Sequence, residues 1–163
     1  MVRRRSFGKR RRARLGMLLH ASCAARGADA VLFLGPPGSG KSDLVLRLLG
    51  LGWALVADDQ LRLHPDGVAV PAALAGRLEV RGLGIFEGLP CAATPVALRL
   101  AVECLAPGLA PPRLPAPRRW SQGGVSLPLV SLCAVEASAP AKVAWALDAV
   151  LGLRRQGAGA FAG

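Results

Sequence analysis

A glycine- and serine-rich octapeptide, GPPGSGKS at residues 35–42, constrains this chain more than any other stretch. It fits the pattern G-x-x-x-x-G-K-[ST], which a chain of this composition would produce by chance only about 0.002 times. In such a loop, backbone N–H groups and the start of a helix surround phosphate oxygens, while the lysine and serine serve the outer phosphates and magnesium. The alternative is a plain glycine-rich turn. We expect a nucleotide phosphate site formed by Gly35, Pro36, Pro37, Gly38, Ser39, Gly40, Lys41 and Ser42.

The residues on either side of this loop predict an α/β fold. Residues 28–34 and 53–57 are short apolar runs typical of buried strands. Between them, the spacing of Leu44 and Leu48 predicts a helix that begins at Lys41. The order strand, helix, strand fits a right-handed crossover. We therefore expect a single α/β domain with a P-loop kinase-like mixed sheet and flanking helices.

Further elements are expected along the rest of the chain. The alternation around Pro65-Asp66-Gly67 predicts a hairpin over 61–70. We also expect a strand running into a glycine-rich loop over 78–88, strands over 95–105 and 125–136, a proline-rich surface loop over 106–124, and a helix over 138–153 with Ser138 as its N-cap.

The formal charge of +11 is concentrated at the amino terminus. Residues 1–14 hold eight arginines and lysines and no acid, which leaves a net charge of +3 for the rest. We expect a basic disordered tail over 1–16, one domain over 17–155 and a flexible end over 156–163. An arm for nucleic acid or anionic membranes is the less favoured alternative for the tail. Met17 is an alternative start of translation.

Cysteine usage and hydropathy indicate a cytoplasmic protein. Cys23, Cys91, Cys104 and Cys133 show no CxxC spacing, so we expect small buried residues in a reducing compartment rather than a metal site. No uncharged apolar run approaches the roughly 18 residues that span a bilayer.

Two aspartates, Asp58 and Asp59, follow the apolar run 53–57. They would emerge at the carboxyl edge of the sheet, where α/β proteins bind ligands. Because neighbouring strand residues face opposite sides, we expect one to meet the metal or a side chain and the other to face an acceptor. Turn formation is the alternative for such a pair.

Three more polar residues are candidates on weaker grounds. Glu79 and Arg81 alternate with apolar residues, so both are expected on one strand face, as site residues or as an exposed ion pair. His20 lies beside apolar residues in LLHAS and is either a catalyst or a packed residue.

Taken together, LLHAS, GPPGSGKSDL, ALVADD and LEVRGLGI resemble, in this order and spacing, the catalytic domain of HPr kinase/phosphorylase. The best match is the short alphaproteobacterial form that lacks the usual amino-terminal domain, over residues 17–155. The phosphate loop alone is shared with many unrelated enzymes, whereas VADD with EVRGLG is far more specific. The resemblance implies an enzyme that uses ATP and Mg²⁺ to phosphorylate a serine of HPr, the phosphocarrier of the sugar phosphotransferase system, or of its nitrogen-related paralogue. It also implies removal of that phosphate by inorganic phosphate.

The resemblance further implies a role for each matching residue. Lys41 would contact the β and γ phosphates, and Ser42 and Glu79 would hold magnesium. Asp59 would accept the seryl proton in phosphorylation and return it in the reverse step.

Asp58 and His20 would support Asp59, and Arg81 would act in catalysis within the signature segment 78–87. Because full-length relatives are hexamers, homo-oligomerisation is expected.

Two arginines of the larger relatives lack a clear counterpart. One, associated with dephosphorylation, aligns with Val125 in GGVSLP. The candidates for the other are Arg99, Arg113, Arg118 and Arg119. The matched residues therefore imply kinase activity, whereas the arginine associated with dephosphorylation has no counterpart here. A small-molecule kinase or regulatory ATPase, and a non-catalytic nucleotide sensor or nucleic-acid binder, are the alternatives.

Overall fold

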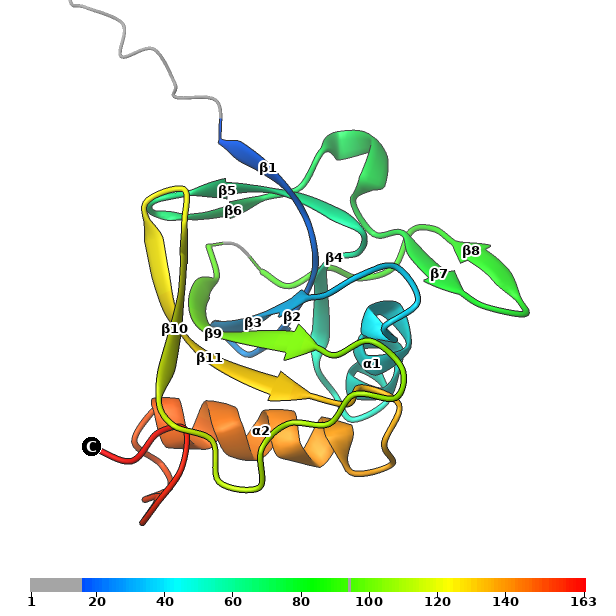
Figure 1. The fold of residues 1–163 in the computed structure, drawn as a ribbon. Helices are drawn as coiled ribbons and strands as arrows, with labels where there is room; N and C mark the ends of the chain where they lie inside the picture. The colour runs from blue at the N-terminus through cyan, green and yellow to red at the C-terminus, as the bar shows by residue number, and fades with distance from the viewer. Residues whose placement is uncertain (1–15, 94) are drawn as a thin grey trace, which may run out of the picture.

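The computed structural model describes residues 16–93 and 95–163, so nearly all of the predicted basic tail lies outside the described residues. The centre of the fold is a mixed six-stranded sheet with the order β10-β11-β9-β3-β2-β4 (Figure 1). Its strands are β2 (Ser22–Arg26), β3 (Asp29–Leu34), β4 (Ala54–Ala57), β9 (Ala97–Cys104), β10 (Arg118–Gln122) and β11 (Val125–Leu132).

The strand directions confirm the predicted crossover around the phosphate loop. Strands β3, β9 and β11 run parallel, and β10 is antiparallel to β11. Strand β2 lies between β3 and β4 and is antiparallel to both, so β3 and β4 run in the same direction. Helix α1 (Lys41–Leu49) connects them. The predicted unit is therefore present, with β2 inserted between its two strands.

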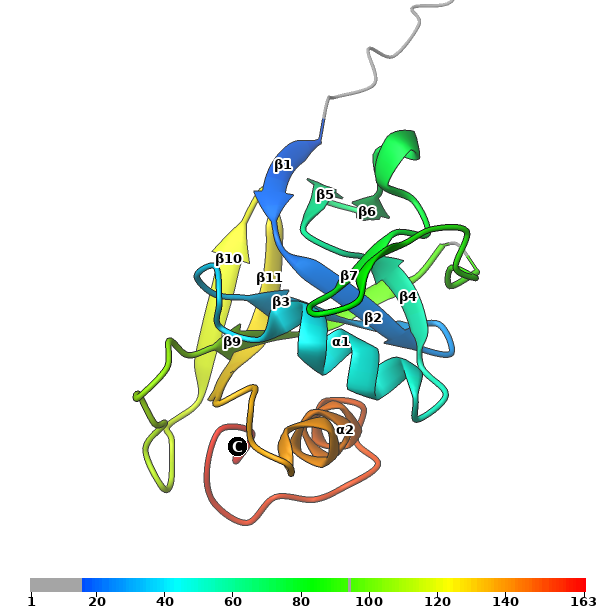
Figure 2. The ribbon, with the colours of Figure 1, turned by 90° about the vertical axis from the view of Figure 1, so that its right-hand side faces the viewer.

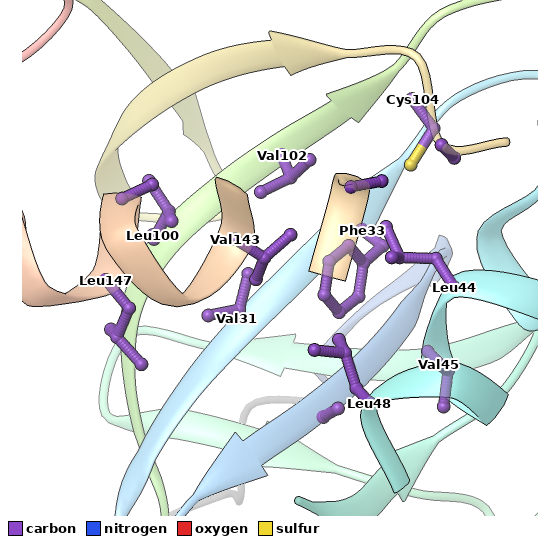
Figure 3. Close-up of a cluster of buried hydrophobic side chains, with 14 of the residues drawn as sticks. Val31, Phe33, Leu44, Val45, Leu48, Leu100, Val102, Cys104, Val143 and Leu147 are labelled. Carbon is purple, nitrogen blue, oxygen red and sulfur yellow. The ribbon is translucent and has the colours of Figure 1, made fainter. Parts of the chain in front are cut away.

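Two helices cover one face of this sheet, as Figure 2 shows. Helix α1 buries Leu44, Val45 and Leu48, and α2 (Ala139–Val150) buries Val143 and Leu147. These side chains pack on the sheet in one cluster, drawn in Figure 3. Burial of each leucine or valine stabilises the fold by roughly 1.5–3 kcal/mol.

A small antiparallel sheet covers the other face. Its strands are β1 (Met17–His20), β5 (Gln60–His64) and β6 (Gly67–Ala69), in the order β1-β5-β6. The hairpin predicted over 61–70 is confirmed by the pairing of β5 with β6. Leu61 and Leu63 of β5 lie in a second buried cluster with Leu127 and Leu129 of β11.

A second hairpin, β7 (Leu78–Val80) and β8 (Gly84–Phe86), projects from the body of the molecule in Figure 1. A 3-10 helix, η1 (Ala72–Leu74), precedes it. The strand expected over 78–88 is therefore two short strands, because residues 81–83 form a turn. Arg81 lies in this turn, so the prediction that it shares a strand face with Glu79 is wrong.

The sequence did not predict β1 or β2. Strand β2 reads SCAAR, whose small residues have weak β propensity. They form a strand because β2 is enclosed by β3 and β4, and Ser22, Cys23, Ala24 and Ala25 are all fully buried. Only small side chains fit such a position.

The surface loop predicted over 106–124 is also too long. Its last part is β10, an exposed edge strand with arginines at its start. Gly123 and Gly124 both have positive φ, 57° and 79°, which suits a two-residue hairpin turn into β11.

The carboxyl-terminal region differs in detail from the prediction. Ser138 precedes α2 but makes no side-chain capping hydrogen bond, and the helix ends at Val150 rather than at residue 153. Within the segment 156–163, Ala160 is buried and Phe161 packs against the core. The described part of the chain contains no helix with the length and hydrophobicity of a membrane-spanning segment.

The cysteines follow the prediction in part. Cys23 and Cys104 are buried, and burial raises the pKa of each thiol to about 12. Cys133 is half-buried, but Cys91 is exposed, so the prediction of four buried cysteines is wrong there.

Candidate active site

The phosphate loop connects the carboxyl end of β3 to the first residue of α1. Three of its glycines, Gly35, Gly38 and Gly40, have positive φ values of 138°, 82° and 91°. Gly40 is the N-cap residue of α1 and no side chain caps the helix. The first amides of α1 therefore lack the usual capping acceptor and are available to an anion at the positive end of the helix.

The loop packs against the end of β9. A Cβ atom built on Gly35 would lie 2.3 Å from the carbonyl oxygen of Cys104 and 2.9 Å from Ser39 Oγ. Only glycine fits there. Beside this contact is an open cavity of about 410 Å³, lined in part by Gly35, Pro36, Glu103 and Trp120.

Two polar side chains of the loop fit a phosphate ligand. Lys41 Nζ donates to the carbonyl oxygens of Gly35, at 2.7 Å, and Pro36, at 3.1 Å, so its ammonium group lies over the start of the loop. Ser39 Oγ is buried and has no hydrogen-bond partner among the described residues. An orphaned hydroxyl and a lysine held by main-chain carbonyls are groups that an incoming phosphate can satisfy.

Asp58 is the polar centre of the site. Its side chain is buried, and Oδ1 accepts hydrogen bonds from Ser22 Oγ and Ser42 Oγ, both at 2.8 Å. Its second oxygen, Oδ2, accepts from the backbone amide of Glu79 at 3.3 Å. One carboxylate thus connects β2, the first turn of α1 and β7.

Asp59 has the opposite environment. It is exposed, and its φ of 68° is the only positive value among the described non-glycine residues. The amide of Gln60 donates to the carbonyl oxygen of Asp58 at 2.8 Å, which closes a three-residue γ-turn centred on Asp59. The amide of Ala21 donates to the carbonyl oxygen of Asp59 at 3.1 Å and holds this strained residue from the opposite strand.

The remaining predicted site residues, Glu79, His20 and Arg81, differ in how they are connected to Asp58 and Asp59. The side chain of Glu79 is exposed, and its backbone contacts Asp58. His20 pairs with Gln60, next to Asp59, but forms no ion pair or side-chain hydrogen bond within the described part of the chain. Arg81 is exposed in the hairpin turn.

Within the described residues, the four arginines considered as counterparts of a catalytic arginine form no hydrogen bond to Asp58 or to the phosphate loop. Arg99 pairs with Asp29 at 2.8 Å, and Arg118 pairs with Glu103 at 3.3 Å. Arg119 donates to Ser126, and Arg113 lines a groove beside α2.

The oxygen-bearing side chains of the site suit a hard cation such as Mg²⁺ that takes most of its ligands from water and phosphate. No cluster of three or more His, Cys, Asp or Glu side chains that could hold a metal is present among residues 16–93 and 95–163. Magnesium usually keeps several waters and binds through one or two carboxylates together with substrate phosphates. The hydroxyl of Ser42 beside the carboxylate of Asp58, with the exposed side chain of Glu79 on the strand whose amide contacts Asp58, suits that mode.

Two residues of the site escaped prediction. Ser22 lies in a strand that the sequence did not predict, although a hydroxyl within an apolar run is a signal for a buried polar contact. Arg47 donates to the carbonyl oxygens of Glu136, at 3.0 Å, and Ala134, and so fixes α1 to the segment after β11. Nothing in the sequence identified its acceptors, because they are main-chain groups.

No family model matches the chain. It is 47% identical over 62 residues to the HPr kinase/phosphorylase of Cupriavidus necator and 48% identical over 62 residues to that of Burkholderia cenocepacia. Each match covers 35% of this chain and only 19% of the relative.

A solved structure extends the likeness to most of the fold. The Hpr(Ser) kinase/phosphatase from Coxiella burnetii superposes with a TM-score of 0.68 at 22% identity, covering 84% of this chain and 98% of that one. The resemblance to HPr kinase/phosphorylase drawn from the motifs is confirmed, and so is the predicted mixed α/β fold.

Proposed function

We propose that this chain is an ATP-dependent protein-serine kinase whose acceptor is an HPr-like phosphocarrier protein. The observation that supports the proposal is the hydrogen bond from Ser42 to Asp58 at 2.8 Å, because Ser42 ends the phosphate loop and Asp58 is followed directly in the chain by the exposed Asp59. The curated relatives named HPr kinase/phosphorylase support the choice of acceptor.

The residues of the loop would hold ATP and Mg²⁺. The first amides of α1 and Lys41 would contact the phosphates, and Ser42 and Glu79 would hold the cation. Bound Mg·ATP supplies the phosphoryl group and neutralises part of its charge. Because Lys41 is already held over the loop by Gly35 and Pro36, little rearrangement is needed to bring it to a phosphate.

The proton of the acceptor goes to Asp59. A serine hydroxyl is a poor nucleophile near neutral pH, so a carboxylate beside it must take the proton as the new bond forms. Asp59 is exposed to an incoming protein, whereas the three hydrogen bonds of Asp58 commit that carboxylate to positioning. His20 supports Asp59 from the neighbouring strand, and Arg81 reaches the acceptor or its phosphate from the hairpin turn.

The reverse reaction uses the same groups. Inorganic phosphate attacks the phosphorus of the seryl phosphate and forms pyrophosphate, and as the bond from phosphorus to the serine oxygen breaks, protonated Asp59 returns its proton to that oxygen. We include this phosphorolysis in the proposal as a second activity of the site. As in the relatives' names, kinase and phosphorylase would share one centre.

A small-molecule kinase or regulatory ATPase is the alternative. The phosphate loop alone would serve such enzymes, but the comparisons favour the protein kinase because the matching curated relatives are named for HPr.

The test is incubation of the purified protein with ATP, magnesium and each HPr paralogue of its own genome, followed by mass spectrometry for phosphoserine. Addition of inorganic phosphate then tests reversal.

Normal ATP binding without labelling of any carrier would refute the proposal, and rapid turnover with a metabolite would favour the alternative. Light scattering on the same sample tests the proposed homo-oligomer, a hexamer by resemblance.

A further inference from the structure

Ser22 is a fully buried hydroxyl that the proposed function has not used. It lies at the start of β2, where the neighbouring residues are apolar and also fully buried. Its only hydrogen bond among the described residues is the one it donates to Asp58 Oδ1, at 2.8 Å. A buried hydroxyl needs a partner, but an apolar residue could have filled the position without needing any.

The same oxygen, Asp58 Oδ1, also accepts a hydrogen bond from the hydroxyl of Ser42. Ser42 has one proton, and donating it to Asp58 leaves the lone pairs of its oxygen free to face a cation. The orientation of Ser42 therefore depends on the position of Asp58 Oδ1. Ser22 fixes that position from the opposite side, from a strand enclosed in the sheet.

Two consecutive residues at the junction of β1 and β2, Ala21 and Ser22, hold two consecutive aspartates. Ser22 binds the side chain of Asp58, and the amide of Ala21 binds the carbonyl oxygen of Asp59. These contacts lie at the bend where the chain leaves the six-stranded sheet for the small sheet. Residues 21 and 22 thus form one rigid support for both acids.

We propose that Ser22 is a positioning residue of the active site, which orients Asp58 so that Ser42 presents its lone pairs to the cation that accompanies the nucleotide. This inference rests on the proposed function for its catalytic consequence. Its effect on binding requires only that the loop take a magnesium nucleotide.

The test compares Ser22→Ala with the parent chain by calorimetry of ATP binding at graded magnesium concentrations and in EDTA. Loss of a group that orients a metal ligand weakens metal binding by about 10- to 100-fold, so the magnesium requirement should rise by about tenfold or more. ATP binding in EDTA should not change. Ser22→Thr keeps the hydroxyl and should restore the magnesium requirement.

Cys23→Ala is the matched control, because Cys23 is the next residue of β2, is also fully buried, and packs in the second cluster on the opposite face of the sheet from α1. It should leave the magnesium requirement unchanged at a comparable loss of thermal stability. If Ser22→Ala fails to fold, Ser22→Cys is the second variant, because a thiol has nearly the shape of the hydroxyl but is a much weaker hydrogen-bond donor. It must show the same rise in the magnesium requirement.

A magnesium requirement equal to that of the parent in Ser22→Ala or Ser22→Cys would overturn the inference. The two proposals fail separately. A parent protein that binds Mg·ATP but labels no carrier contradicts the proposed function, while the binding measurement still decides the role of Ser22.

Discussion

Asp58 and Asp59 are adjacent in the chain, yet the side chain of Asp58 accepts three hydrogen bonds in the interior while Asp59 is exposed. The separation comes from the backbone: a γ-turn at Asp59, with φ of 68°, breaks the strand between the two residues. The first acid can therefore hold the phosphate loop while the second meets an acceptor. Substitutions at the two positions should have different consequences.

Asp59→Asn should strongly slow catalysis and spare the fold. Asparagine tolerates the left-handed backbone conformation, and the side chain is exposed, so stability should change little. Loss of a general base should lower the rate of phosphoryl transfer by about 10²- to 10⁴-fold. Quenched-flow or mass-spectrometric rates of carrier phosphorylation measure this, with ATP affinity by calorimetry as the control. A variant that keeps the parent's rate would show that another group takes the proton.

Asp58→Ala should destabilise the fold. The change leaves the buried hydroxyl of Ser22 and the amide of Glu79 without their acceptor, and each unsatisfied buried group costs about 1–3 kcal/mol. Urea denaturation should show the loss in the free energy of unfolding. Asp59→Asn serves as the comparison, because it alters the neighbouring carboxylate with no such loss; equal stability of the two variants would contradict the difference in environment.

The motif and the elements around it could be predicted from the sequence because their signals are local. A glycine pattern specifies the loop, and the spacing of Leu44 and Leu48 specifies the buried face of α1. Strand β2 could not be predicted in this way. Its small residues are strand-forming only because two other strands enclose them, and that enclosure depends on contacts distant in the sequence.

The distinction between local signals and contacts distant in the sequence also applies to the residues of the site. VADD at the end of an apolar run predicted that the two acids have different environments, which the structure confirms, but the cause is the turn at Asp59 and not the strand alternation on which the prediction rested. Their roles stay a prediction. The partner of Asp58 in β2 was missed because the contact joins residues 22 and 58 across a pairing of strands that no short pattern encodes. Edge strand β10 was missed for a related reason: it is polar and exposed, so it lacks the alternation that marks a half-buried strand.

Two glycines of the phosphate loop should respond differently to alanine. At Gly35 the new Cβ would lie 2.3 Å from the carbonyl oxygen of Cys104, so the loop or β9 must move, at a cost of roughly 2–4 kcal/mol. At Gly38 nothing lies within 4 Å of the new atom. There only the left-handed backbone, with φ of 82°, opposes the change, by about 1–2 kcal/mol.

Thermal unfolding and ATP affinity of Gly35→Ala and Gly38→Ala check this difference. We expect Gly35→Ala to lose both stability and ATP binding, and Gly38→Ala to keep its fold. Equal losses in the two variants would mean that backbone conformation, and not the contact with Cys104, determines the need for glycine at position 35.

Thiol modification should separate the cysteines by burial. The thiolate is the reactive form, and burial raises the pKa of Cys23 and of Cys104 to about 12, so both stay protonated and shielded at pH 8. Cys91 is exposed and should react first with iodoacetamide in the native protein. Peptide mass spectrometry over time measures each site, and Cys91→Ser should remove the fast phase. Cys23 and Cys104 should react only after denaturant is added, because unfolding restores both access and the ordinary pKa. Modification of either in the native protein at the rate of Cys91 would show that the core around β2 or the end of β9 opens readily.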